Sequence, residues 1–182
     1  MGRSKLTSMK EAVARFVPAG ASVSMGTALE AAIPFAAGHE LIRQGKRDLT
    51  LICPISDMLF DQLIGAGCAR RVIGAWVGNV TAGLGYNFRR AAEHGIPNAL
   101  EVVDHSNFTI SLALLAGSLG APYIPTRSLL GSSLLESNPT FKRSSDPWSG
   151  DPIVLVPGLT PDVTILQVQR ADADGNCHYW GI

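Results

Sequence analysis

The sequence predicts an α/β fold, an open and mostly parallel sheet with helices on both faces. After a first helix, segments with strand and helix periodicity alternate as β-α-β-α-β-α-β-α along roughly the first 120 of the 182 residues. Such alternation makes successive strands parallel and the helices between them crossovers. Apolar residues make up 46% of the chain and charged residues 16%, a composition that supports a buried core. We expect a single domain over residues 1–182.

Local signals mark the first helix and the first strand. Ser8 and Glu11 have the spacing of a capping box, and an amphipathic run follows them. Residues 21–25 alternate with the period of a strand and lead into Gly26 and Thr27. We therefore expect this strand to end in a loop that begins with glycine.

The next elements repeat the same rhythm. Three strands are expected at residues 49–53, 71–77 and 100–103. Four helices are expected from Pro34 to just before Gly45, from a cap at Ser56 or Asp57 to Ile64, at residues 86–94 and at residues 107–119. The connections between these segments are short, as crossovers in such a sheet require.

The rhythm breaks in the last third of the chain. Residues 121–152 contain five prolines and little periodicity, which predicts a long loop with a functional or interface role. Regular strands return at 153–156 and 163–169, and Asp174-Gly175 predicts a tight reversal into a strand at 177–180. The chain stops soon after this strand begins, which suggests a C-terminal truncation.

Charge and cysteine content exclude several classes of partner. The formal net charge is zero and the basic residues form no stripe, so a nucleic acid partner is not expected. Cys53, Cys68 and Cys177 are too scattered for a disulfide framework, and the four histidines lack metal-ligand spacing. The apolar stretch at 110–117 is too short to span a bilayer. We expect a cytoplasmic protein without a metal or a membrane segment.

Three glycine-containing loops are candidates for ligand binding, because ligands of open parallel sheets settle where strands end. They are Gly26-Thr27, the segment 78–85 with Gly78 and Asn79, and the segment 127–133 with Arg127, Gly131 and Ser132. Glycine lets backbone N–H groups approach a ligand, and a guanidinium can hold a carboxylate or phosphate. The alternatives are that the glycines only serve turn geometry, that the arginine bonds loop carbonyls, and that the serine caps a helix.

His105 and Ser106 are the candidates for acid-base or nucleophilic chemistry. They stand where a predicted strand delivers the chain to a helix N-terminus. A capping or core role for the histidine is an equally good interpretation. Nucleotide fingerprints of the G-x-G-x-x-G and Gly-Lys-Ser/Thr types are absent from the sequence.

Several segments together resemble family I coenzyme A transferases. Residues 20–34, GASVSMGTALEAAIP, are similar to the family's glycine-rich signature. They keep Gly26 and Pro34 at its interval, with Thr, Ala and Ala in place of the signature's Gly, Phe and Gly. Residues 86–91, YNFRRA, and 123–133, YIPTRSLLGSS, resemble A subunits of the glutaconate CoA-transferase type. Residues 169–176, QRADADGN, resemble the family's Ala-Asp-x-x-Gly-Asn turn.

The resemblance implies the three-layer fold of these transferases and a role as an A subunit. Such an enzyme moves CoA between an acyl-CoA thioester and a carboxylic acid, with CoA as a substrate and no permanently bound cofactor. In this family a glutamate of the B subunit, in a Glu-Asn-Gly-like motif, attacks the thioester. This chain has no such motif. The resemblance thus implies a B-subunit partner, without which the chain is inactive, and a cleft wall formed by the loops at Gly26 and Arg127.

Two other interpretations stay open. A ring-opening acyl-CoA hydrolase of the same fold would be expected to have a glutamate near position 105, where this chain has His105 and Ser106. A non-catalytic relative that binds CoA esters would fit the two missing signature glycines.

Overall fold

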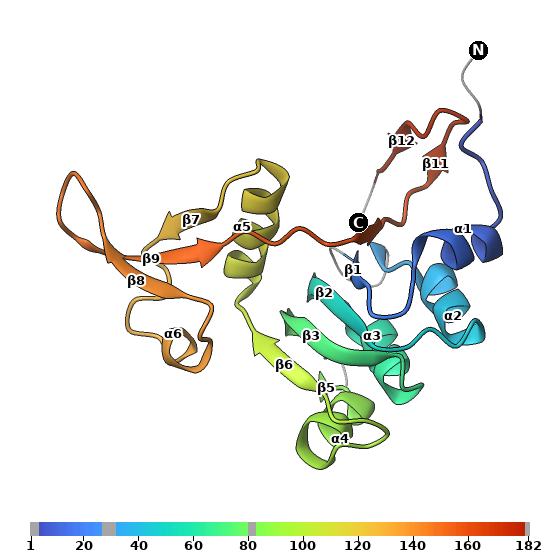
Figure 1. The fold of residues 1–182 in the computed structure, drawn as a ribbon, viewed down its shortest axis with the longest axis horizontal. Coiled ribbons are helices and arrows are strands. Elements are labelled where there is room, and N and C mark those ends of the chain that lie inside the picture. The colour runs from blue at the N-terminus through green and yellow to red at the C-terminus, as the bar shows by residue number, and fades with distance from the viewer. Residues whose placement is uncertain (1–3, 27–31, 80–82, 181–182) are drawn as a thin grey trace.

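A computed structural model describes residues 4–26, 32–79 and 83–180, and it confirms the expected α/β class (Figure 1). Five strands form a parallel sheet in the order β10-β1-β2-β3-β6. Their bounds are β1 (Ser22–Met25), β2 (Leu49–Ile55), β3 (Ala69–Trp76), β6 (Glu101–Asp104) and β10 (Val163–Ile165). All five carboxyl ends therefore lie along one edge of this sheet.

Helices cover both faces of the sheet, as predicted. The helices are α1 (Met9–Phe16), α2 (Phe35–Arg43), α3 (Asp57–Gly65), α4 (Tyr86–His94) and α5 (Asn107–Ser118). The first four contribute to a core with Leu51 of β2, whereas α5 packs its Ile110 against Ile52 on the opposite face. Successive strand residues point to opposite faces. Leu51 and Ile52 are both buried, so β2 is a continuous apolar run.

The prediction of one long loop at residues 121–152 is wrong, because this segment contains two strands and a short helix and leads into a third strand. Three antiparallel strands pair in the order β7-β9-β8. A short helix lies between β7 and β8 in the chain. Their bounds are β7 (Tyr123–Thr126), α6 (Leu134–Ser137), β8 (Lys142–Ser145) and β9 (Pro152–Pro157). Val154 and Val156 of β9 pack with Ala113 of α5, which lies between the two sheets (Figure 1).

Two short antiparallel pairs complete the described structure. One joins β4 (Gly78–Asn79) to β5 (Gly83–Leu84), directly after β3. The other joins β11 (Arg170–Ala171) to β12 (Cys177–His178) and confirms the predicted reversal at Asp174-Gly175. This last hairpin lies beside the N-terminal segment, where the Lys5 N–H donates to the Ala173 carbonyl at 2.8 Å (Figure 1).

Candidate active site at the carboxyl edge of the parallel sheet

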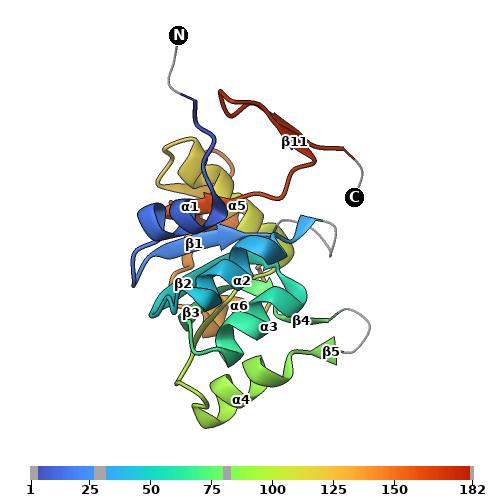
Figure 2. The ribbon, with the colours of Figure 1, turned by 90° about the vertical axis from the view of Figure 1, so that its right-hand side faces the viewer.

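The candidate site lies where β1, β2, β3 and β6 end, because their parallel pairing brings four loop entrances to one edge. These entrances are Gly26 after β1, Ser56 after β2, Gly78 after β3 and His105 after β6. Figure 2 shows the arrowhead of β1 pointing toward the same side of the molecule as the β4–β5 pair. Thr27, which we predicted to line the site, lies outside the described residues.

Gly26 sits in close contact with the start of α3. Its φ is +78°, a left-handed conformation that residues with a Cβ rarely adopt. A Cβ at this position would lie 3.0 Å from the Ser56 hydroxyl oxygen and 3.5 Å from the Ile55 carbonyl oxygen. The ends of β1 and β2 can therefore approach this closely only because residue 26 is glycine.

The Cys53 side chain joins the same two strand ends. Its sulfur lies beside the carbonyl oxygens of Gly26 and Ile55. Burial raises the pKa of the thiol to about 12, and the negative charge of Asp57 adds to the rise. Cys53 is therefore a neutral thiol at physiological pH and is not a nucleophile.

Ser56 and Asp57 begin α3 at the centre of this edge, and both are fully buried. Ser56 is the N-cap residue, as predicted, but its hydroxyl makes no capping hydrogen bond to the helix. The helix dipole brings partial positive charge to this position, where backbone N–H groups can stabilise a developing anion.

Gly78 and Asn79 form strand β4, directly after the carboxyl end of β3. A Cβ on Gly78 would lie 2.5 Å from the Gly83 carbonyl oxygen and 2.8 Å from the Gly85 nitrogen, so only glycine fits there. A small cavity of about 80 Å³ lies between β3, β5 and β6, next to Trp76. It is smaller than ordinary ligand pockets of roughly 300–1,000 Å³. We therefore assign no ligand to that cavity.

His105 and Ser106 have structural contacts in this fold. The His105 ring packs edge-on against Phe141 with ring centroids 5.0 Å apart, and burial lowers its pKa to about 4. The imidazole is thus neutral at pH 7. The Ser106 hydroxyl accepts a hydrogen bond from the Thr109 N–H at 3.1 Å and completes a capping box for α5. These contacts favour the capping and core interpretation that the sequence left open.

Arg127, Gly131 and Ser132 belong to a different part of the molecule. Arg127 follows β7 in the second sheet and forms an exposed ion pair with Asp151 at 2.6 Å. The Ser132 hydroxyl accepts a hydrogen bond from the Leu134 N–H. Strands β1 and β7 lie on opposite sides of α5 in Figure 1. The loops at Gly26 and Arg127 therefore follow strands of two different sheets, and the prediction that they form one wall stays a prediction.

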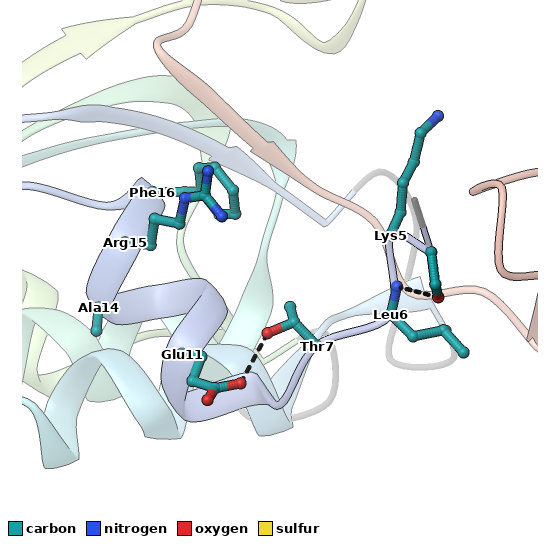
Figure 3. Close-up of a pocket in the computed structure, with 8 residues that line it drawn as sticks. Lys5, Leu6, Thr7, Glu11, Ala14, Arg15 and Phe16 are labelled. Carbon is teal, nitrogen blue, oxygen red and sulfur yellow. Dashed lines mark hydrogen bonds between the residues drawn. The ribbon is translucent and has the colours of Figure 1, made fainter. Parts of the chain in front are cut away.

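A wide hollow elsewhere lacks the features of an active site. It has a volume of about 970 Å³ and lies between the N-terminal segment and α1 (Figure 3). Its Glu11 carboxylate accepts hydrogen bonds from Thr7 and Ser8, and the Arg15 guanidinium stacks over Phe16. The hydrogen bonds of Glu11 stabilise the start of α1, and the described residues that line the hollow lie in or before this helix.

Sequence reasoning found the glycines of the site but missed Cys53. The available signal was its position at the end of an apolar strand, just before Pro54. Within residues 4–26, 32–79 and 83–180, no group of three or more His, Cys, Asp and Glu side chains could hold a metal ion. In the same ranges no helix is long and apolar enough to cross a membrane.

Comparisons with known proteins agree on one family. Residues 6–182 match the family model of coenzyme A transferases. The A subunit of the 3-oxoadipate CoA-transferase of Pseudomonas knackmussii is 42% identical over 178 residues, which are 98% of this chain and 63% of that protein. The chain therefore spans less than two thirds of this curated relative's length.

Two solved structures share the fold over 98% of this chain. Glutaconate coenzyme A-transferase from Acidaminococcus fermentans has a TM-score of 0.89 at 30% identity, with 61% of its chain covered. The decarboxylase AibA/AibB, solved as its C56S variant, has a TM-score of 0.86 at 31% identity, with 67% of its chain covered.

Proposed function

Because this chain belongs to the coenzyme A transferase family, we propose that it is the A subunit of a heteromeric CoA transferase. The proposed enzyme moves CoA between an acyl-CoA thioester and a carboxylic acid. The observation that carries the proposal is the family match across residues 6–182, together with a relative whose own name specifies an A subunit. The names of two relatives specify 3-oxoadipate and glutaconate, both dicarboxylic acids. Dicarboxylic acids are therefore the first acceptors to test.

The proposed reaction is a ping-pong exchange with a covalent intermediate. A glutamate carboxylate from a B subunit first attacks the thioester carbonyl, and CoA leaves as its thiolate, which gives an acyl-glutamyl anhydride. The thiolate then attacks the glutamyl carbonyl, which releases the first acid and leaves a glutamyl-CoA thioester. The acceptor carboxylate repeats these two steps in reverse, which forms the new acyl-CoA and frees the glutamate.

In this proposal the present chain contributes backbone groups at the carboxyl edge of its parallel sheet. Each acyl transfer passes through a tetrahedral oxyanion that N–H donors must stabilise. The loops that begin at Gly26 and Gly78 are the proposed donors, with Thr27 and Asn79 beside them. Arg127, Gly131 and Ser132 lie in the connection between β7 and α6, beside the second sheet, and in this proposal they reach the CoA ester in the assembled enzyme.

The described glutamates support a nucleophile from another polypeptide. Glu40 is bound by Arg43 and Gln44, and Glu101 pairs with Arg71. Neither carboxylate faces the four loop entrances of the candidate site. Glu30 lies outside the described residues, so an experiment must compare it with the partner's glutamate.

Borohydride trapping tests the assignment. We expect the chain, co-purified with a B subunit, then treated with acyl-CoA and borohydride, to yield a reduced glutamate on the partner by peptide mass spectrometry. A Glu30→Gln variant should still be trapped at the partner and is the matched control. A modified glutamate on this chain would refute the role of an A subunit without a nucleophile.

A decarboxylase is the second candidate, because one solved relative with this fold carries that activity in its name. Product analysis separates these activities. Transfer requires an acceptor acid, hydrolysis yields free acid without one, and decarboxylation releases CO₂ while the thioester persists. A non-catalytic relative would bind CoA esters in calorimetry without turning them over.

The free state of Cys53, Cys68 and Cys177 fits our proposal of a cytoplasmic enzyme.

A further inference from the structure

One face of the second sheet is apolar and accessible to solvent. Antiparallel pairing sets Tyr123 opposite Pro157 and Pro125 opposite Leu155, so these four side chains share a face. Val154 points to the other face, where it packs with α5. Tyr123 is 46% exposed, Pro125 is exposed and Leu155 is half-buried, whereas the solvent side of such a sheet is normally polar. We call this surface the outer face; it consists of Tyr123, Pro125, Ile153, Leu155 and Pro157.

A tryptophan extends the outer face at one end of the molecule. Trp148 is 92% exposed and lies in the turn between β8 and β9, which is the far left of the ribbon in Figure 1. Together with Pro125 and Ile153, it lines a hollow of about 230 Å³. The indole and the outer face thus form one continuous apolar surface, which is the kind of patch that marks an interaction site.

The turn keeps its shape without help from the indole. The Asp146 carboxylate accepts hydrogen bonds from the N–H groups of Trp148 at 2.8 Å and Ser149 at 3.3 Å. The Asp146 carbonyl accepts from the Gly150 N–H at 2.8 Å. All three donors are main-chain groups, so the ring projects from a turn that is already ordered. A preorganised aromatic side chain loses little conformational entropy when a partner binds it.

The second sheet adjoins the candidate site. Asn138, which follows α6, donates to the carbonyl of Asp104 at the end of β6 at 2.7 Å, and Phe141 packs against His105. In Figure 1 the arrowheads of β3 and β6 point toward the side of the molecule where the second sheet lies. A polypeptide that brings a glutamate to this carboxyl edge therefore approaches beside the second sheet.

The charges next to the outer face favour a different polypeptide over a second copy of this chain. Strand β8 is at one edge of the second sheet, and its Lys142 and Arg143 are both exposed. Two copies joined edge to edge through β8 would bring these like charges together, which is unfavourable. A partner that carries carboxylates at this position would instead be attracted.

We propose that the outer face and Trp148 dock the B subunit, which buries the indole in an apolar pocket and sets carboxylates beside Lys142 and Arg143. This inference rests on the proposed function, because the B subunit is part of that proposal. An apolar centre with a charged rim is the usual anatomy of a subunit interface. Tryptophan is also enriched among the residues whose truncation costs most of the binding energy.

Sedimentation of the full chain with purified B subunit, in the absence of substrate, tests this surface. Trp148→Ala should raise the Kd of the complex by about 30-fold or more, as expected for a central interface residue. Trp180→Ala is the matched control, because this tryptophan is 53% exposed but lies beyond the β11–β12 hairpin, and its Kd should stay at the wild-type value. Since the Trp148 ring is exposed, Trp148→Ala should unfold at the same denaturant concentration as the wild type.

A charge reversal tests the rim. Lys142→Glu should lower the association rate at low salt, and added salt should reduce the difference from the wild type. Lys10→Glu reverses an exposed lysine on α1 and should leave the association rate unchanged. Equal rates for Lys142→Glu and the wild type would contradict an acidic partner surface beside β8.

Three results overturn the proposal: an unchanged Kd in Trp148→Ala, equal losses in Trp148→Ala and Trp180→Ala, or a dimer of this chain alone that Trp148→Ala converts to a monomer. The last result would assign the outer face to a second copy. Assembly and chemistry are measured separately. If the wild-type complex forms but transfers no CoA, the proposed function fails, while the Kd values still decide the docking surface. If transfer occurs, Trp148→Ala should reach the wild-type kcat at saturating B subunit.

Discussion

Substitution of Gly26 by alanine tests the geometry on which the candidate site depends. Two costs follow from the structure: a left-handed φ of +78° for a residue with a Cβ, and a Cβ 3.0 Å from the Ser56 hydroxyl oxygen. The first costs about 1–2 kcal/mol. Because Ser56 is fully buried and cannot swing into solvent, the second adds about 1–2 kcal/mol of overpacking.

Gly20 is the matched control for the backbone cost. Its φ is +79°, and an added Cβ would meet nothing within 4 Å. The Gly20→Ala variant therefore carries the same φ penalty and the same gain from a stiffer unfolded chain. The difference in unfolding free energy between the two variants isolates the contact with Ser56, and we expect about 1–2 kcal/mol.

Denaturant unfolding, with CoA transfer measured in the presence of a B subunit, completes this experiment. Gly26→Ala should lose at least about tenfold in kcat/KM, whereas Gly20→Ala, at the amino end of β1, should lose none. The double variant Gly26→Ala/Ser56→Ala should recover part of the stability, because the nearest remaining atoms lie at 3.5 Å. Equal stabilities of Gly26→Ala and Gly20→Ala would refute the close approach of the two strand ends.

Three further predictions concern the packing and electrostatics around the site. In a helix, glycine to alanine usually stabilises a protein by about 1 kcal/mol. Gly117→Ala should instead destabilise this protein by more than about 2 kcal/mol, because the added Cβ would lie 1.9 Å from the Leu159 carbonyl oxygen. The pKa of His105 is lowered to about 4, so stability should be full above pH 6.5 and fall by up to about 3 kcal/mol as the pH drops toward 4. His105→Gln should remove that fall in urea titrations. Arg127→Met and Asp151→Asn should each change stability by less than about 1 kcal/mol, because their ion pair is exposed.

Control variants make these predictions decisive. Ser118→Ala, next in the same helix, should leave stability nearly unchanged, and a loss equal to that of Gly117→Ala would contradict the clash. His94→Gln changes an exposed histidine and should keep the acid-dependent loss seen in the wild type. An acid response that survives in His105→Gln would place its origin elsewhere. A large loss of stability in Arg127→Met would contradict the exposure of its ion pair.

The parallel sheet and its helices could be predicted because their signals are local. The helix at Tyr86–His94 was predicted with the same bounds that the structure shows, from a periodic run closed by Gly95. Ser106 was recognised beside a helix start, and its capping box with Thr109 is a contact over three residues. Local signals of this kind depend on neighbours in the chain and need no knowledge of the packing.

The second sheet escaped prediction for the opposite reason. Its strands β7 and β8 are each four residues long. Pro125 interrupts the pattern of β7, and β8 is exposed along its length. Strands of this kind form only because β9 between them pairs with both, as in Tyr123 opposite Pro157 and Lys142 opposite Leu155. Pairing across such separations has no periodic trace in either strand taken alone.

The sequence alone predicted the α/β class and the alternation of parallel strands and helices along the chain. It also showed the family resemblance and the glycines that follow β1 and β3. The tertiary structure decided which of these loops meet. It placed Gly26 against Ser56 and beside the Cys53 thiol, and it put Arg127 directly after β7, a strand of a different sheet. The physical reason is that strand order and register set distances between residues remote in the chain, and these depend on the packing of the whole domain.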